Sequence, residues 1–158
     1  YPLMKRFTYW PQLFLGITFN YGLILGWTAI YGEINLLPIL FYFGAIFWTL
    51  GYDTIYGYQD LKDDEIIGLK STSIKFKNNP IKFLIMCYAV FLFTILMIGL
   101  LMDLNKIFYL HYLIIFLQIF YFQIKKLNIK NKLICLKIFK SNNFLGFLVF
   151  LGLVAGKI

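Results

Sequence analysis

Long apolar stretches dominate the sequence and restrict what it can fold into. A helix needs about 20 mostly apolar residues to cross the roughly 30 Å hydrocarbon core of a bilayer. Four stretches approach or reach that length, and a fifth does so if the lysine-rich turn before its apolar part is helical. They are residues 12–31, 36–57, 83–102, 107–124 and 140–156. We therefore expect an all-α, multi-pass transmembrane helix bundle that forms a single membrane domain over residues 1–158.

Composition excludes a soluble domain of this size. The chain is 61% hydrophobic and only 14% charged, whereas a soluble domain carries about 25% charged residues. The two cysteines, Cys87 and Cys135, lie far apart in the sequence, without the close pairing of structural zinc sites or CxxC redox motifs. We interpret both as packing residues.

The positive residues predict how the helices are oriented. Of the 15 Lys and Arg residues, all except Lys106 and Lys157 flank one side of a five-span model. Because positive residues concentrate in cytoplasmic loops, this side is predicted to be cytoplasmic, together with the N-terminus and the acidic loop after the second stretch. The net charge of +8 then matches an anionic leaflet and does not indicate a nucleic-acid partner.

Small residues and one histidine are predicted to serve packing. Two GxxxG pairs, Gly22/Gly26 and Gly152/Gly156, are typical of helices that approach closely, and we expect this packing to be within the chain. His111 is the only histidine and lies in the fourth stretch, far from the acidic loop. We interpret it as a structural hydrogen-bonding residue.

Carboxylates gather directly after the second stretch. Five of the seven acidic residues lie there: Asp53, Asp60, Asp63, Asp64 and Glu65. If the second span continues as a helix, steps of 100° per residue place Asp53, Asp60 and Asp64 within about 40° on one face. Such oxygen ligands suit Mg²⁺, which takes one or two carboxylates together with water and substrate phosphates. Spacing alone also allows a solvated acidic loop or an ion-transport site.

Three segments resemble one enzyme family. Residues 52–72 read YDTIYGYQDLKDDEIIGLKST and resemble the second aspartate-rich motif of the UbiA-type prenyltransferases, in particular the 4-hydroxybenzoate polyprenyltransferase branch. Residues 1–16, YPLMKRFTYWPQLFLG, are similar to the segment that precedes this motif, and residues 141–152, SNNFLGFLVFLG, to the last span. The resemblance covers essentially the whole chain in order, as the C-terminal portion of that family.

The resemblance implies roles for six charged residues. Three aspartates would be catalytic: Asp53, Asp60 and Asp64. Of these, Asp60 and Asp64 would hold the Mg²⁺ cofactor against the diphosphate, with Asp53 as a further candidate ligand. Three cations would bind substrate: Lys5, Arg6 and Lys70. The implied reaction transfers a polyprenyl group from polyprenyl diphosphate to the ring of 4-hydroxybenzoate, ortho to the hydroxyl and meta to the carboxylate, in ubiquinone biosynthesis.

Two further groups of residues have alternative interpretations. The rings of Tyr52, Tyr56 and Tyr58 could stabilise a carbocation, but a role as anchors at the membrane boundary is favoured. Asn142 and Asn143 match asparagines of the family, and helix capping explains one of them without substrate contact. We therefore leave both asparagines out of the predicted site.

The family also implies parts that this sequence does not match. Its members have about nine spans around a central cavity, with a first aspartate-rich motif, NDxxDxxxD, on an earlier helix. These five spans would form one wall, so we expect negligible activity from this chain alone. A fragment, a split enzyme with a separately encoded N-terminal half, and a decaying gene all explain the difference.

The sequence also permits functions other than 4-hydroxybenzoate prenylation. A related enzyme could act on another aromatic acceptor, such as dihydroxynaphthoate, homogentisate or a porphyrin. A non-catalytic membrane subunit or cation-pathway protein would need polar residues along a face through the spans, and the spans here are almost purely apolar. The predicted location is the bacterial inner membrane, with the mitochondrial inner membrane as the alternative.

Overall fold

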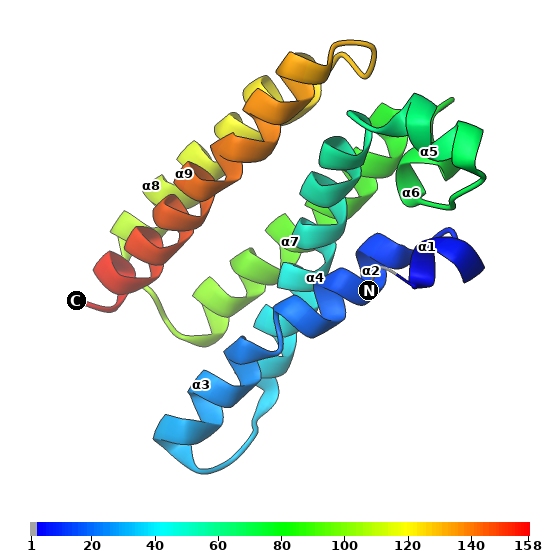
Figure 1. Cartoon of the computed structure of the whole chain (residues 1–158). Coiled ribbons are helices and arrows are strands. Elements are labelled where there is room, and N and C mark those ends of the chain that lie inside the picture. The colour runs from blue at the N-terminus through cyan, green and yellow to red at the C-terminus, as the bar shows by residue number, and fades with distance from the viewer. Residues whose placement is uncertain (1–2) are drawn as a thin grey trace.

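All regular elements in the described part of the chain are helices. The computed structural model describes residues 3–158, so Tyr1 and Pro2 of the N-terminal motif lie outside it. In chain order the helices are α1 (Met4–Phe7), α2 (Pro11–Phe19), α3 (Gly22–Tyr31), α4 (Leu36–Gly57), α5 (Leu61–Ile67), α6 (Thr72–Lys75), α7 (Pro80–Leu101), α8 (Lys106–Gln118), the π-helical segment η1 (Ile119–Lys125) and α9 (Lys132–Lys157) (Figure 1).

Within residues 3–158, five helical segments are long and apolar enough to cross a membrane, which confirms the predicted all-α, multi-pass bundle. They are Pro11–Tyr31 (α2 with α3), Leu36–Gly57 (α4), Pro80–Leu101 (α7), Lys106–Lys125 (α8 with η1) and Lys132–Lys157 (α9). The last helix begins at Lys132 rather than at residue 140, so the lysine-rich turn is part of the helix. Its first turn is capped by the side chain of Asn131, which accepts a hydrogen bond from the backbone N–H of Ile134.

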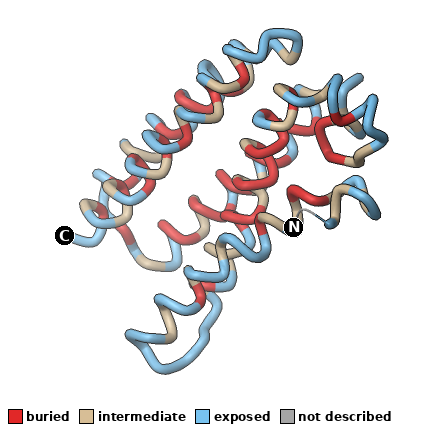
Figure 2. Tube along the Cα trace, in the orientation of Figure 1, coloured by how far each residue is buried: buried red, intermediate tan, exposed pale blue. Residues whose placement is uncertain are grey.

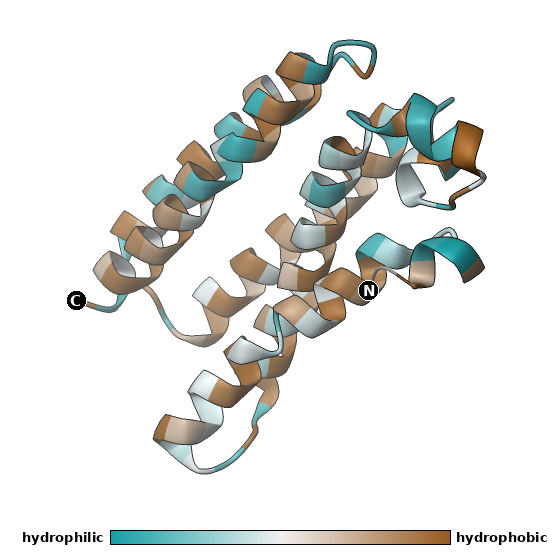
Figure 3. Cartoon of the chain, viewed as in Figure 1, coloured by the Kyte–Doolittle hydropathy of each residue, from teal (hydrophilic) through white to brown (hydrophobic). Residues whose placement is uncertain are grey.

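The helices form two closely packed groups. One group contains α4 and α7, with α2 and α3 lying along α4, and the other contains α8 and α9 (Figure 1). Buried residues run along the facing sides of these helices, whereas α3 is mostly exposed (Figure 2). Hydrophilic residues are prominent on α1, on α5 and in the loop before α9 (Figure 3). These segments share one end of the bundle, opposite Lys106 and Lys157, as the charge pattern predicts.

Glycines allow close contact at some helix crossings and not at others. A Cβ added at Gly44 would lie 2.0 Å from Thr94 Oγ1, so α4 and α7 almost touch there. Gly156 packs against Phe108 in the same way, and Gly152 against His111, which confirms one predicted GxxxG contact. The prediction for Gly22 and Gly26 is wrong, because nothing lies within 4 Å of a Cβ at either position.

The first span is divided by a polar side chain. Asn20 separates α2 from α3, and its Nδ2 donates to the carbonyls of Gly16 and Ala45 and to Thr49 Oγ1. Two of these acceptors belong to α4, so the amide attaches the break to the neighbouring helix. Ring nitrogen Nδ1 of His111 donates to the Ile107 carbonyl of its own helix at 2.9 Å.

Candidate functional site

The loop after α4 differs from the continuous helix that the aspartate spacing predicted. α4 ends at Gly57, and the backbone N–H groups of Tyr58, Gln59 and Asp60 each donate to the carbonyl three residues earlier. The helix therefore tightens and the chain leaves its axis before α5 begins. Gly57, the last residue of α4, also lies at a close tertiary contact, where a Cβ would be 2.3 Å from Ser73 Oγ. The prediction that Asp53, Asp60 and Asp64 share one face of a single helix is wrong.

The aspartates of the motif consequently occupy different surroundings. Asp53 is buried near the end of α4, and Asp64 is buried on α5. Asp60 is exposed at the position that precedes α5. Within residues 3–158, no three His, Cys, Asp or Glu side chains are grouped closely enough to form a metal site by themselves.

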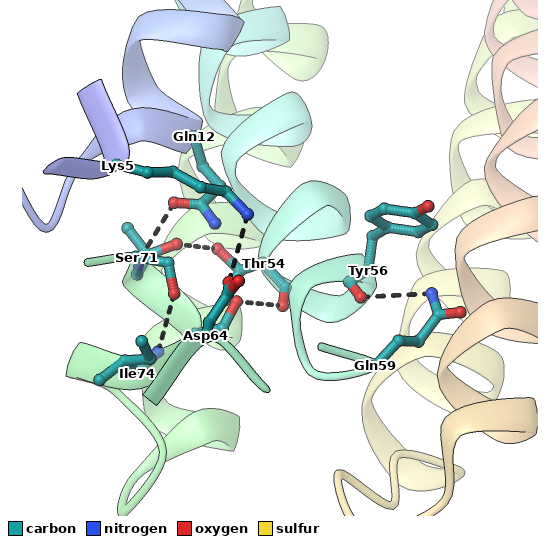
Figure 4. Close-up of polar contacts among 10 residues, drawn as sticks. Lys5, Gln12, Thr54, Tyr56, Gln59, Asp64, Ser71 and Ile74 are labelled. Atoms are coloured by element: carbon teal, nitrogen blue, oxygen red, sulfur yellow. Dashed lines mark hydrogen bonds and ion pairs between the residues drawn. The ribbon is translucent and has the colours of Figure 1, made fainter. Parts of the chain in front are cut away.

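One predicted cation meets one predicted metal ligand. Nζ of Lys5, on α1, lies 3.2 Å from Asp64 Oδ2, on α5 (Figure 4). The backbone N–H of Lys70 donates to the Lys5 carbonyl at 2.7 Å, so Lys70 also lies near this contact. We call the region around Lys5, Asp64 and Lys70 the carboxylate corner. Its ammonium lies 5.7 Å from the centre of the Tyr9 ring. Arg6, the remaining predicted cation, is exposed on α1.

The other two carboxylates of the loop pair with surface lysines. Asp63 Oδ2 lies 3.4 Å from Lys132 Nζ, with both side chains mostly exposed. Glu65 Oε1 lies 2.5 Å from Lys77 Nζ. Such exposed pairs contribute about 0–1 kcal/mol, so these two carboxylates fit a solvated acidic loop.

A buried network of hydroxyl and amide groups holds the loop in place. Oε1 of Gln12 accepts a hydrogen bond from the backbone N–H of Thr72 at 3.0 Å. The hydroxyls of Thr72 and Thr54 lie 2.6 Å apart, and Ser73 Oγ donates to the Thr54 carbonyl at 2.8 Å. Figure 4 shows Gln12 of α2 and Thr54 of α4 close to Asp64. Because buried polar groups are costly when unpaired, this network fixes α6 on α2 and α4.

Sequence reasoning missed these positioning residues. Gln12 and Thr72 lie in the quoted family segments, yet only the charged members of those segments were assigned roles. The available signal was a run of hydroxyl residues, Ser71 to Ser73, between two apolar spans, together with a glutamine at the start of a span. Polar side chains at such positions need partners, and here they become each other's partners.

A hollow of about 380 Å³ lies between α2, α4 and α9. Its wall combines aromatic rings with amide and hydroxyl groups: Phe19, Asn20, Trp48, Thr49, Tyr52, Phe139, Asn142, Asn143 and Gly146. Tyr52 packs edge-on against Trp48 and Phe139. A flat aromatic molecule with a polar substituent suits such a wall.

Asn142 is the centre of a second buried network, which links the two helix groups. Its Oδ1 accepts hydrogen bonds from Trp48 Nε1 and from Gln123 Nε2, each at 2.8 Å. Gln123 lies in η1 and accepts a hydrogen bond from the Tyr88 hydroxyl. The capping interpretation of the asparagines is wrong, because both lie well inside α9. Asn142 orients Trp48 at the hollow, and Asn143 is exposed on the same wall.

The three tyrosines of the motif are placed differently from one another. Tyr56 packs against Phe139 with the ring centres 4.6 Å apart, and Tyr52 lies at the hollow. Tyr58 is buried in the core, and its hydroxyl has no hydrogen-bond partner within residues 3–158. Burial raises the pKa of Tyr58 above its usual value, with a smaller contribution from nearby Cys135. Both cysteines are buried free thiols, as the packing interpretation predicts.

The chain matches known proteins along nearly its whole length. The model of the UbiA prenyltransferase family matches residues 1–152. The 4-hydroxybenzoate polyprenyltransferase, mitochondrial, of Bos taurus is 42% identical over 100% of the chain and 43% of its own length, and that of Homo sapiens gives the same values. The protein of that name from Drosophila melanogaster is 43% identical over 99% of the chain and 40% of its own length. The chain thus spans about two fifths of these relatives. No solved structure matches it significantly.

Proposed function

Because this chain belongs to the UbiA prenyltransferase family, we propose that it forms one wall of a 4-hydroxybenzoate polyprenyltransferase of ubiquinone biosynthesis. The enzyme would transfer a polyprenyl group from polyprenyl diphosphate to the ring of 4-hydroxybenzoate. The relatives' printed names support this acceptor over other aromatic compounds. The observation that carries the proposal is the contact between Lys5 and Asp64, which joins two motifs 59 positions apart in the sequence.

The oxygen donors at this corner suit Mg²⁺ bound together with a diphosphate. Mg²⁺ needs only one or two protein carboxylates when substrate phosphates and water fill its other positions, so a cage of three carboxylates is unnecessary. Asp60 and Asp64 would hold the ion, with Asp53 as a further ligand. When bound, Mg²⁺ would neutralise negative charge on the departing diphosphate.

The proposed reaction explains what the cations of the chain would do. The bond between the allylic carbon and the diphosphate oxygen breaks, a carbon–carbon bond forms ortho to the acceptor hydroxyl, and that ring carbon loses its proton. Negative charge grows on the diphosphate, where Lys5, Arg6 and Lys70 would stabilise it. Asp64 would hold Lys5 in position through the 3.2 Å contact, so that little reorganisation is needed during the reaction.

The hollow between α2, α4 and α9 is proposed to receive the acceptor ring. Trp48 and Tyr52 offer flat apolar surfaces, and Asn143 offers an amide to a polar substituent. A site between apolar helices also keeps water away from an allylic cation. The remaining part of the enzyme, which corresponds to the unmatched length of the relatives, would close the opposite wall.

The helices indicate that the chain lies in a membrane, and we propose from the relatives' names which membrane it is. The chain has multiple membrane-crossing helices. The relatives' names include the word mitochondrial, which supports the mitochondrial inner membrane and gives no support to the bacterial one. On either membrane, the end with α1 and α5 would lie on the side where the positive-inside rule places Lys and Arg residues.

The proposal is tested by measuring transfer of a radiolabelled polyprenyl group to 4-hydroxybenzoate in membranes that contain the chain. The assay is run with Mg²⁺ or EDTA, and with or without the unmatched portion of a relative supplied as a separate polypeptide. We expect activity only when both polypeptides and Mg²⁺ are present, and its loss with Asp60→Ala. Robust activity of the chain by itself would show that it contains a complete site. No activity under any condition, despite membrane insertion of both polypeptides, would contradict the proposed function.

A further inference from the structure

A groove between η1 and α9 lies apart from the carboxylate corner. It has a volume of about 350 Å³ and is lined by Phe122, Lys126, Ile134, Lys137, Ile138 and Ser141. We call it the Lys126–Lys137 groove. At 100° per residue, Phe139 lies about 160° around α9 from Lys137. The groove and the proposed acceptor hollow therefore occupy nearly opposite flanks of the same helix.

The two lysines of this groove are not neutralised by the protein. Within residues 3–158, three ion pairs form, and their cations are Lys5, Lys77 and Lys132. A neighbouring basic hollow beside α5 includes Lys77 and Lys132, so part of its charge is already balanced. Lys126 lies 4.0 Å from the centre of the Phe122 ring, which stabilises the ammonium without removing its charge. The groove thus presents uncompensated positive charge.

The length of α9 places this charge at the level of lipid headgroups. Crossing about 30 Å takes about 20 residues. Counted back from Lys157 at one membrane surface, this distance reaches Lys137 at the other. Lys126 directly follows the span that ends at Lys125. Ile138 and Ser141 then lie deeper. Phe122, 47% exposed and four residues before Lys126, supplies apolar surface below the lysines, whereas Ile138 is buried.

We propose that the Lys126–Lys137 groove binds an anionic phospholipid. The phosphate of the headgroup contacts the two ammonium groups, and one acyl chain lies along the exposed ring of Phe122. This arrangement combines positive charge at headgroup depth with an apolar wall directly beneath it, which is the combination that such a lipid requires. The inference concerns a different flank from the proposed catalytic site and does not depend on that activity.

The test measures binding of the first phospholipid to the purified full chain in neutral detergent by native mass spectrometry. Phosphatidylglycerol and phosphatidylcholine with identical acyl chains are compared. We expect phosphatidylglycerol to bind at least tenfold more tightly. The double substitution Lys126→Gln with Lys137→Gln should weaken its binding about 25-fold, from two charge contacts of roughly fivefold each.

The chain offers a control of equal charge in the same segment. Lys125→Gln with Lys140→Gln removes two positive charges beside the groove without changing its lining, and should weaken binding less than threefold. Lys126→Arg with Lys137→Arg keeps the charge and should retain binding. Equal losses in the two glutamine variants would show diffuse attraction and overturn the proposal. So would similar affinity for the two lipids, failure of the arginine variant to bind, or full competition by equimolar glycerol 3-phosphate, which has no acyl chain.

Discussion

The two ends of α4 are connected to their neighbours in very different ways. At its start, residues 32–35 form a short exposed turn from α3, with Gly32 in the left-handed conformation and Asn35 capping α4. At its end, residues 58–79 contain α5 and α6, and buried hydrogen bonds to Gln12 and Thr54 attach this segment to α2 and α4. The first end is therefore an exposed turn, whereas the second is held in place by buried hydrogen bonds. We call residues 58–79 the platform.

The difference indicates where precise positioning matters. A connection on the surface can satisfy its backbone groups with water, so buried partners are not needed merely to reverse the chain. The platform instead buries Thr54 and Thr72 and places the Lys5–Asp64 contact at its edge. Substitutions at the two ends of α4 should therefore have unequal consequences, and the following experiments measure that inequality.

The largest effect is expected from Asp64→Asn. This change keeps the shape of the side chain but removes the negative charge that would hold Lys5 and contribute to Mg²⁺ binding. In the two-polypeptide assay, we expect the transfer rate to fall by at least about 100-fold, the usual effect of losing one preorganised electrostatic contact. Asp63→Asn removes an equal charge from the adjacent exposed position and should change the rate less than about threefold. Equal losses would assign the effect to the net charge of the loop.

The next largest effect is expected from Gly57→Ala, and it concerns stability. The new Cβ would lie 2.3 Å from Ser73 Oγ and 3.4 Å from Gln12 Nε2, so α6 must move away from α4. We expect a loss of about 2 kcal/mol in the free energy of unfolding in detergent micelles. The control Gly22→Ala lies at the start of α3, where nothing is within 4 Å of the new Cβ. This change should stabilise the helix slightly. A neutral Gly57→Ala would mean that the platform adjusts easily.

The contrast between the ends also shows what the sequence can predict. The five spans follow from the length of apolar stretches, because burial of the backbone in lipid permits little besides helices. The spacing of the aspartates does not predict the helix end at Gly57, nor the close contact of Gly57 with Ser73, which is distant in sequence. The break at Asn20 similarly depends on acceptors at Ala45 and Thr49. The π-helical turn around Gln123 has the same apolar pattern as an ordinary helix.

The candidate site was predictable in composition and not in geometry. The resemblance of the motifs identified Lys5 and Asp64, but only the fold shows that the two side chains touch. Spacing placed Asp53, Asp60 and Asp64 on one helix, whereas α4 ends before Asp60. Asp60 is the exposed N-cap residue of α5, and its carbonyl accepts a hydrogen bond from the Asp64 N–H at 2.8 Å. Charged residues attract functional assignments in a sequence, while neutral positioning residues such as Gln12 and Asn142 become visible only through their partners.

A smaller effect is expected from Gln12→Leu, which removes the acceptor for a buried backbone N–H. The amide of Thr72 would lose its 3.0 Å hydrogen bond, and an unpaired buried donor costs about 1–3 kcal/mol. We expect hydrogen exchange at Thr72 and Ser73 to accelerate by about tenfold or more, while amides of α3 keep their rates. Acceleration spread evenly over both ends of α4 would show that Gln12 supports the whole bundle and not the platform specifically.

The smallest effect is expected at the other end of α4, from Asn35→Ala. The Asn35 side chain accepts a hydrogen bond from the Leu37 N–H at 3.1 Å, but this donor is exposed. Water replaces the lost acceptor, so the cost should be about 1 kcal/mol, the usual value for a helix N-cap. Transfer activity should remain within about twofold, because α5 and α6 are attached through other residues. If Asn35→Ala accelerated hydrogen exchange at Thr72 and Ser73 as strongly as Gln12→Leu, the exposed turn would also control the segment after α4, and the contrast between the two ends would be wrong.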